Sequence, residues 1–322
     1  MAVYTEVSDA DLTRFLAGYD VGELVSYRGI AEGVENTNYM VTTTTGPLIL
    51  TLYEKRVAGG DLPFFVGLME HLASNGVSCP VPLRNKQGDA LSTLSNRSAA
   101  LVTFLDGFWL RAPAPRHCHA VGKALAELHL AGSSFNMQRA NALGLAGWQK
   151  LQQELTGRLN GINPALEDMI TQELTHLERH WPQDLPTGII HADLFPDNVF
   201  FLDDQLSGLI DFYFACQDAF AYDFAIALNA WCFEKDFSFN ITKGSALFEG
   251  YESVRKFDEA ERQALPTLAR GAAMRFLLTR CSDWLSTPSD ALVKPHNPLD
   301  YQRRLQFHQA ATSSTDYGHR PG

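Results

Sequence analysis

The pattern of apolar and polar residues changes character near residue 104. Before that point it is mostly typical of strands, with apolar runs or alternation bounded by Gly, Pro and Asn turns. A first helix is predicted after a capping box at Ser8 and Asp11, and a second over 62–73. This part of the chain is therefore predicted to be an antiparallel sheet with a flanking helix. Its expected strands cover 25–30, 39–43, 47–53, 90–94 and 99–104.

After Leu105-Asp-Gly107 the spacing of apolar residues becomes helical. We therefore expect an α+β chain with two lobes, 1–104 and 105–310. The tail over 311–322, rich in Ser, Thr and Gly, is predicted to be disordered. The helices expected in the second lobe cover 115–132, 145–160, 164–181, 219–232, 243–254 and 258–285, with short β runs at 187–191, 199–202 and 206–210.

Composition narrows the range of partners. The 322 residues include 37 acidic and 26 basic side chains, a net charge of −11, and no Lys/Arg-rich stretch. A nucleic-acid or anionic-membrane surface is therefore not expected, and small substrates fit better. No signal-peptide pattern or apolar run of membrane length occurs, which predicts a cytoplasmic protein. The five cysteines are scattered without CxxC spacing, so we expect them to be reduced and mostly buried.

The most informative stretch begins with the apolar run before His191. Asp193 follows two residues later, then Asn198, and Asp211 lies thirteen residues after Asn198 at the end of a second apolar run. A strand and a short hairpin would bring these acceptor side chains to one edge. Phosphoryl transfer needs an alcohol oriented in line and Mg²⁺ to neutralise the phosphates of ATP.

This group of side chains supplies both requirements. Asp193 would orient the substrate hydroxyl and accept its proton, while Asn198 and Asp211 would offer oxygen ligands to Mg²⁺. His191 is assigned to holding the loop by hydrogen bonding, without a part in the chemistry. A single Asp in a loop is usually a cap or a turn, and only the combination favours a kinase.

The spacing His-x-Asp-x-x-x-x-Asn is that of a kinase catalytic loop. With it, the chain resembles the aminoglycoside phosphotransferase and choline kinase superfamily. The strings Ala124-Leu-Ala-Glu-Leu-His129 and Ala221-Tyr-Asp223-Phe-Ala are similar to segments of that family. The resemblance covers nearly the whole chain. It implies a protein-kinase-like fold with ATP between the lobes.

Four further strings resemble the bacterial homoserine kinases of this superfamily. They cover 33–39, 50–56, 61–65 and 275–280. The resemblance implies ATP-dependent phosphorylation of the γ-hydroxyl of L-homoserine, which yields O-phospho-L-homoserine on the threonine pathway. The oligomeric state is not predicted.

The residues expected to bind ATP lie in the first lobe and in the connector after it. Gly33, Asn36 and Asn38 would cover the phosphates, although the same residues could form an ordinary hairpin turn. The backbone of the connector, from Thr103 to Leu105, would bind adenine. No Walker A motif occurs anywhere.

The chain departs from the kinase pattern on the third strand. Thr51 stands where a phosphate-binding Lys is expected, and Phe65 stands near the position of its Glu partner. Either Lys55 or Arg56 replaces that pair, or phosphate binding depends on the loop and Mg²⁺. The alternative for Lys55 and Arg56 is a solvated charge cluster.

An amino-acid substrate needs a guanidinium for its carboxylate and an acid for its ammonium. Arg275 is the preferred carboxylate ligand, with Arg280 as a second, and Asp193 or Asp223 would meet the ammonium. The alternative is that both arginines form structural salt bridges. Asp223 could equally cap a helix or hydrogen-bond the catalytic loop.

The sequence is compatible with three other functions. The substrate could be another hydroxylated metabolite, such as choline, methylthioribose or an aminoglycoside. The chain could also be a catalytically silent nucleotide-binding protein, although the base and both metal ligands are present. A protein kinase fits poorly, because the Asp-Phe-Gly and Ala-Pro-Glu pair that frames an activation loop is missing.

Overall fold

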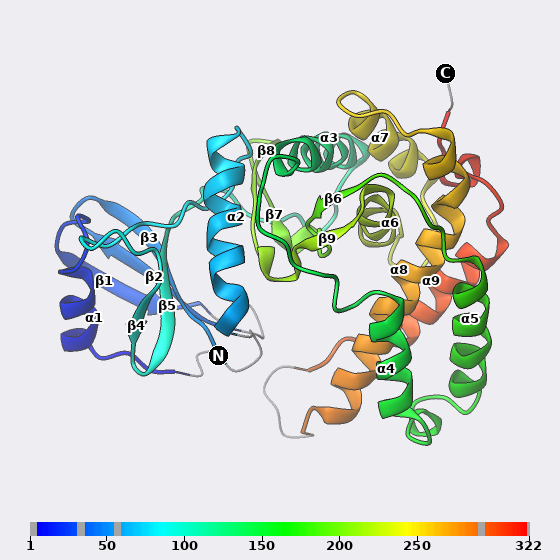
Figure 1. Ribbon diagram of the computed structural model, residues 1–322, viewed down its shortest axis with the longest axis horizontal. Coiled ribbons are helices and arrows are strands. Elements are labelled where there is room, and N and C mark those ends of the chain that lie inside the picture. The colour runs from blue at the N-terminus through cyan, green and yellow to red at the C-terminus, as the bar shows by residue number, and fades with distance from the viewer. Residues whose placement is uncertain (1–4, 31–35, 55–58, 289–293, 321–322) are drawn as a thin grey trace.

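The computed structural model describes residues 5–30, 36–54, 59–288 and 294–320 (Figure 1). Its N-terminal part is a five-stranded antiparallel sheet with the order β1-β2-β3-β5-β4. The rest is mainly helical. The mixed α+β class expected from the sequence is confirmed. The sheet strands are β1 (Leu24–Gly29), β2 (Thr37–Thr43), β3 (Gly46–Leu52), β4 (Ser92–Leu94) and β5 (Arg97–Thr103).

The sheet has its own small core beneath the first helix. Helix α1 (Asp9–Leu16) begins where the Ser8 hydroxyl accepts a hydrogen bond from the Asp11 N–H at 3.2 Å, which is the predicted cap. Leu12 and Leu16 are fully or almost fully buried on its inner side, where they join apolar residues of the sheet. Burial of this apolar stripe is what holds a helix of eight residues in place.

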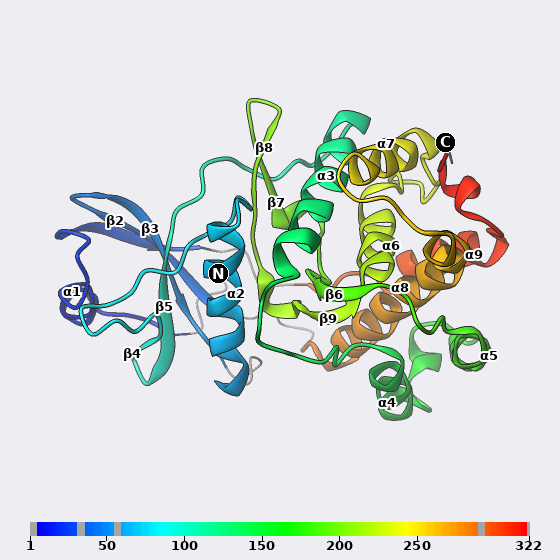
Figure 2. The same cartoon turned by 45° about the horizontal axis from the view of Figure 1, so that its top comes forward.

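Helix α2 (Leu62–Ser74) lies between the sheet and the helical region in both views (Figures 1 and 2). Its mean hydropathy is high, and most of its apolar side chains are buried, among them Phe65 and Leu68. These side chains belong to the larger core, together with residues from the C-terminal helices. The helix therefore packs as a link between the two parts of the chain.

Seven α-helices, two small sheets and four short 3₁₀ helices make up the described C-terminal region. Strand β6 (Thr187–Ile190) pairs with β9 (Cys216–Ala219), and β7 (Val199–Leu202) pairs with β8 (Gln205–Leu209). The β7–β8 hairpin lies between α2 and α3 (Figures 1 and 2). The helices are α3 (Pro115–Gly132), α4 (Leu145–Leu155), α5 (Leu166–His180), α6 (Phe220–Trp231), α7 (Ile241–Glu252), α8 (Glu259–Ser286) and α9 (Leu299–Ala310).

Close helix packing surrounds α6, which is buried along almost its whole length. Helices α3 and α7 lie side by side, and glycines stand at their contact. A Cβ on Gly122 would overlap the Leu247 carbonyl oxygen, and one on Gly250 would overlap the His119 carbonyl oxygen. The two backbones can approach this closely only because both positions lack a side chain.

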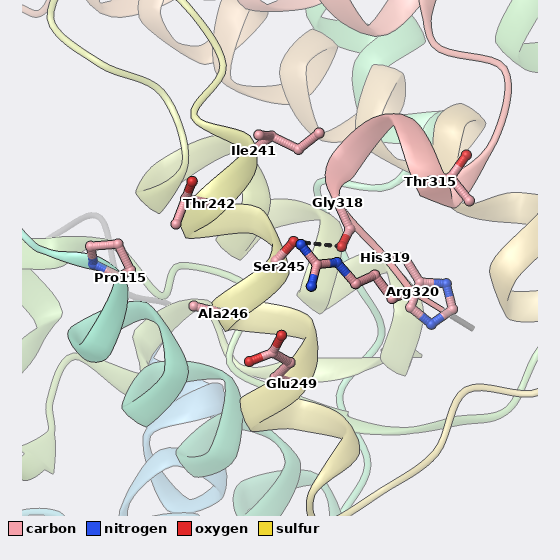
Figure 3. Close-up of a pocket in the computed structure, with 10 residues that line it drawn as sticks. All are labelled: Pro115, Ile241, Thr242, Ser245, Ala246, Glu249, Thr315, Gly318, His319 and Arg320. Carbon is pink, nitrogen blue, oxygen red and sulfur yellow. Dashed lines mark hydrogen bonds between the residues drawn. The ribbon is translucent and has the colours of Figure 1, made fainter. Parts of the chain in front are cut away.

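The predicted disordered tail is wrong for residues 311–320. This segment folds back on α7 and forms a short 3₁₀ helix, Ser314–Tyr317. Tyr317 is fully buried, and the His319 ring stacks on Phe248 with 4.6 Å between ring centroids. Figure 3 shows the surface pocket between α7 and this tail, where the Ser245 hydroxyl donates to the Gly318 carbonyl at 2.7 Å. The prediction rested on composition, which does not show that the rings of Tyr317 and His319 anchor this segment.

Two further elements, α9 and β9, were not predicted from the sequence. The expectation for the cysteines is confirmed, since all five are unpaired and buried. None of the helices in the described ranges is both long and apolar enough to span a membrane.

Candidate active site

The catalytic loop follows β6, and the β7–β8 hairpin brings the second half of the site to it. The buried residues Ile189 and Ile190 anchor β6 in the core. At the other end of the site, the Ile210 N–H donates to the Asn198 carbonyl at 3.0 Å, which places Asp211 next to Asn198. The structure therefore brings together His191, Asp193, Asn198 and Asp211, as the sequence predicted.

The Asn198 side chain fixes its own orientation through Asp193. Its Nδ2 donates to the Asp193 carbonyl at 2.8 Å and to the Asp193 carboxylate at 3.2 Å. With the nitrogen turned to Asp193, the amide presents Oδ1 on its other side. An amide oxygen of this kind is a suitable ligand for a hard cation.

His191 links the catalytic loop to the strand before Asp211. Its Nδ1 accepts from the Asp193 N–H at 3.2 Å, so the proton lies on Nε2, which donates to the Ile210 carbonyl at 3.0 Å. Burial lowers the pKa of His191, which keeps the ring neutral. This is the loop-holding role expected for His191.

Asp223, expected to meet a substrate ammonium, is 0% exposed and lies behind the loop. Its carboxylate accepts from the N–H groups of His191 and Ala192 at 2.7 and 2.8 Å, and from His129 Nε2 at 3.1 Å. Burial alone would raise the pKa of Asp223, but the bonds and charges of His129 and His191 outweigh it and lower the pKa. The substrate role is therefore wrong, and the alternative of a bond to the catalytic loop is right.

A buried polar network continues behind Asp223. His129 Nδ1 lies 2.8 Å from the Tyr251 hydroxyl, and Arg255 reaches the same hydroxyl at 3.2 Å and Glu261 at 2.9 Å. Burial lowers the pKa of His129. The hydrogen bonds between Asp223 and His129 and between His129 and Tyr251 thus connect the loop to α3 and α7.

Arg275, the preferred carboxylate ligand, is 1% exposed and turned away from any substrate. Its guanidinium donates to the Ala192 carbonyl and lies over the rings of Phe214 and Phe276 at 5.4 and 4.6 Å. A group without solvent access behind the loop cannot bind a substrate carboxylate. This prediction is wrong, because the sequence did not reveal which side of α8 faces inward.

Arg280 lies on the same helix, α8, and is less deeply buried than Arg275. Its side chain is 16% exposed and makes a long ion pair of 3.5 Å with Asp300. Its guanidinium lies 4.6 Å from the centre of the Tyr301 ring. Burial lowers the pKa of Arg280, and the charge of Asp193 is among those that act against that fall. Of the two arginines, Arg280 is the one with solvent access, and its charge interacts with that of Asp193.

Three of the residues expected to hold ATP, Gly33, Lys55 and Arg56, lie outside the described residues. Asn38 lies within β2 and not in a loop, where it accepts from the Thr51 hydroxyl at 2.8 Å across the strand pair. Asn36 Oδ1 accepts from the Glu54 N–H at 3.3 Å. Phosphate binding by these residues stays a prediction.

The connector prediction is wrong for the N–H of Thr103. That N–H donates to the Val81 carbonyl at 2.9 Å, and the Thr103 hydroxyl accepts from the Val81 N–H at 2.9 Å. The backbone donor is therefore used in the N-terminal region and cannot serve adenine. Leu105, two residues beyond the end of β5, stays a prediction.

Two tyrosines beside Asp211 were missed by the sequence reasoning. The Tyr213 hydroxyl lies 3.4 Å from that of Tyr53, and the Tyr213 ring also contacts Phe65 at 5.6 Å between centroids. Burial, with a smaller contribution from the charge of Asp211, raises the pKa of Tyr53 to about 12. The available signal was Tyr213 itself, a bulky residue where Asp-Phe-Gly would have glycine.

Residues 26–257 match the model of the phosphotransferase enzyme family. A homoserine kinase of Rhizobium rhizogenes strain K84 is 60% identical over 318 residues, which cover 99% of each chain. A homoserine kinase of Rhizobium meliloti strain 1021 is 58% identical over 99% of this chain and 98% of its own length.

Solved structures with low sequence identity share the fold. An amicoumacin kinase in complex with AMP-PNP and Ca²⁺ aligns with a TM-score of 0.71 at 14% identity, covering 95% of this chain and 94% of its own. A spectinomycin phosphotransferase aligns with a TM-score of 0.69 at 12% identity, covering 98% of both chains. The protein-kinase-like fold implied by the family resemblance is thereby confirmed, and the chain belongs to the phosphotransferase enzyme family.

Proposed function

We propose that this protein is a homoserine kinase, which transfers the γ-phosphoryl group of ATP to the side-chain hydroxyl of L-homoserine. The observation that carries the proposal is the 60% identity, over almost the full length of both chains, to a homoserine kinase. The base and both expected metal ligands lie together at the loop, which argues against the catalytically silent alternative.

In the proposed reaction, Asp193 accepts the proton of the substrate hydroxyl. The hydroxyl oxygen forms a bond to the γ-phosphorus of ATP as the bond from that phosphorus to the β,γ-bridging oxygen breaks. The products are O-phospho-L-homoserine and ADP, and Asp193 then releases the proton to solvent. Asn198 supports this step because it hydrogen-bonds both the backbone and the carboxylate of Asp193.

Magnesium is the proposed metal. The donor set fits it, since the Asn198 amide turns its nitrogen to Asp193 and leaves an oxygen beside the exposed carboxylate of Asp211. Mg²⁺ prefers a few oxygen ligands from the protein together with phosphates and water. When bound, it would neutralise charge on the β- and γ-phosphates.

We propose that Gly33, Asn36, Asn38 and Lys55 bind the phosphates of ATP and that the Leu105 backbone binds adenine. ATP would then lie between two lobes, residues 1–104 and 105–310. As an enzyme of threonine biosynthesis that consumes ATP, the protein is proposed to work in the cytoplasm.

For the amino-acid substrate, Arg280 takes over the carboxylate role first given to Arg275. Its ion pair with Asp300 is long, at 3.5 Å, and its charge interacts with that of Asp193. A guanidinium can bind a carboxylate through two parallel hydrogen bonds, and homoserine joins its carboxylate to its hydroxyl by a short carbon chain. A carboxylate at Arg280 would thus leave the hydroxyl directed to Asp193.

The deciding experiment is a coupled ADP-release assay with Mg-ATP and a panel of alcohols. The panel contains L-homoserine, homoserinol, choline, methylthioribose and kanamycin. The proposal predicts a strong preference in kcat/KM for L-homoserine. Preference for another alcohol would refute the substrate and retain the chemistry, while no turnover on any would refute the kinase.

A further inference from the structure

Arg275 is a buried cation on α8, behind the loop that carries Asp193. Within the described part of the chain it forms no ion pair, and its Nε makes no hydrogen bond. The rings of Phe214 and Phe276 cover it. Removal of a charge from water is unfavourable, and an apolar residue of similar volume would avoid that cost. Its guanidinium donates a hydrogen bond to the Ala192 carbonyl and also interacts with the Tyr222 hydroxyl.

Ala192 has a strained backbone at the centre of the catalytic loop. Its φ is 63°, in the left-handed region that is unfavourable for an alanine because of its Cβ. Such a conformation persists only when its surroundings impose it. Ala192 lies between His191 and Asp193, so its backbone torsions determine the orientation of the Asp193 backbone.

Two opposite charges hold the peptide groups on either side of Ala192. The Asp223 carboxylate accepts from the Ala192 N–H at 2.8 Å, and Arg275 donates to the Ala192 carbonyl. The first contact comes from α6 and the second from α8. Each contact restrains a different peptide plane, and together they fix the torsions of the residue between them.

The loop beyond Asp193 is held by the same two helices through less polar contacts. The Trp231 indole N–H donates to the Leu194 carbonyl at 2.7 Å, and Phe195 packs edge-on against Phe276 at 4.8 Å between centroids. Helices α6 and α8 therefore form a rigid support under the loop. Within that support Arg275 holds the carbonyl side of Ala192, and Asp223 holds its N–H side.

We propose that Arg275 is a positioning residue, which holds the Ala192–Asp193 peptide in its strained conformation and so directs the Asp193 carboxylate to the substrate hydroxyl. The inference rests on the proposed kinase function only for its kinetic readout. Without the guanidinium, Ala192 relaxes to a negative φ, and the Asp193 carboxylate moves from the line of attack.

The kinetic test compares Arg275→Met, Arg275→Lys and wild type with Mg-ATP. Arg275→Met should lower kcat about 100-fold, the order of loss that follows a displacement of about 1 Å at a reacting group. Both KM values should stay within about threefold, because the residue touches neither substrate. The kcat for homoserinol should fall as much as that for L-homoserine. Arg275→Lys should recover part of kcat, because an ammonium can still donate to one carbonyl.

Arg270→Met is the matched control. Arg270 lies on the same helix, but it pairs with Glu173 of α5 at 2.6 Å, away from the catalytic loop. Its loss should lower the melting temperature and leave kcat unchanged. A merely structural role for Arg275 would give the same result as this control.

A second background tests the strain directly. Glycine adopts a positive φ without penalty, so Ala192→Gly removes the need for the restraint. In that background Arg275→Met should reduce kcat by about tenfold or less, and an unchanged 100-fold loss would overturn the proposal. A rise confined to the KM for L-homoserine, with kcat kept, would overturn it as well.

Two further measurements separate the failure modes. If Arg275→Met does not fold, Arg275→Lys in both backgrounds carries the same comparison. If the wild type phosphorylates no alcohol, the proposed function fails, and a crystal structure of the Arg275→Met variant decides the inference. A negative φ at residue 192 in that structure supports it, and a retained positive φ refutes it.

Discussion

Asn198 donates hydrogen bonds to both the carbonyl and the carboxylate of Asp193, at 2.8 and 3.2 Å. The residue proposed to bind the metal therefore also holds the residue proposed to accept the proton. The two functions cannot be altered independently at Asn198. They can be separated at Asp193, because a change there leaves the Asn198 amide oxygen in place.

Asp193→Asn should abolish most turnover while ATP still binds. The amide cannot accept the hydroxyl proton, and loss of a general base typically costs 10²–10⁴-fold, so we expect kcat to fall about 1,000-fold. Thermal stabilisation by Mg-ATP should persist, because a ligand of the native state raises its melting temperature. ADP release and a thermal-shift titration measure the two effects.

The control is Asp204→Asn, which changes a carboxylate of the β7–β8 hairpin that pairs with Arg116 at 2.9 Å on the surface. Its kcat should match that of wild type. Near-normal turnover of Asp193→Asn would remove Asp193 from the base role.

Much of the fold follows from the sequence because its apolar periodicity is strong. The helix over Pro115–Gly132 and the strand over Val199–Leu202 have the predicted bounds, and other elements agree within a few residues. Helix α9 was missed because few of its residues are apolar, and its buried contacts include a histidine. Strand β9 has the sequence Cys-Gln-Asp-Ala, which has no pattern typical of a strand, and it is extended because it pairs with β6.

The arrangement of His191, Asp193, Asn198 and Asp211 was predictable because their spacing along the chain matches a loop followed by a hairpin. The errors at Asp223 and Arg275 concern burial, which residue type does not reveal. Arg275 and Arg280 are five residues apart on one helix, so their side chains point about 140° apart. Only the packing of α8 against the loop decides which of the two faces inward.

Arg280→Met should weaken binding of L-homoserine specifically. Loss of a guanidinium–carboxylate pair should raise the KM for L-homoserine about 10- to 100-fold. The KM for homoserinol, which lacks the carboxylate, should change little. Steady-state kinetics with both substrates at saturating Mg-ATP give the comparison.

Arg303→Met serves as the control, since Arg303 is an exposed residue of α9 that lies over the Phe237 ring at 4.8 Å. It should leave both KM values unchanged. Equal increases for L-homoserine and homoserinol in Arg280→Met would contradict a carboxylate contact.

His129→Phe should destabilise the protein by about 2–3 kcal/mol, because the buried Asp223 carboxylate loses the partner that lies 3.1 Å away. Asp223 also holds the loop, so kcat should fall together with stability. Urea unfolding measures the first effect and ADP release the second. A variant with wild-type stability would show that His129 does not compensate the buried charge.

The pH dependence of stability should carry the signature of His308. This fully buried ring links α9 to α6 and to the tail. Its Nε2 lies 3.0 Å from Oδ1 of Asn229 on α6, and its Nδ1 lies 3.1 Å from the Tyr317 hydroxyl. Burial, aided by the charges of Arg304 and Arg270, lowers the pKa of His308 from 6.5 to about 3. The native state therefore resists protonation that the unfolded chain accepts.

The folded-state pKa of His308 is lowered, so below about pH 6.5 the unfolded chain binds a proton that the native state does not. The contribution of neutral His308 to stability is therefore complete above about pH 6.5 and is lost as the pH falls toward 3. Between pH 7 and 4.5 the free energy of unfolding should fall by about 2.5 kcal/mol on account of this group. His308→Gln should be less stable at pH 7 and lose that part of the acid slope in urea titrations. His119→Gln, which changes an exposed histidine of α3, should keep the slope. If both variants retain it, acid sensitivity arises from other buried groups, and the tail is not secured by a neutral His308.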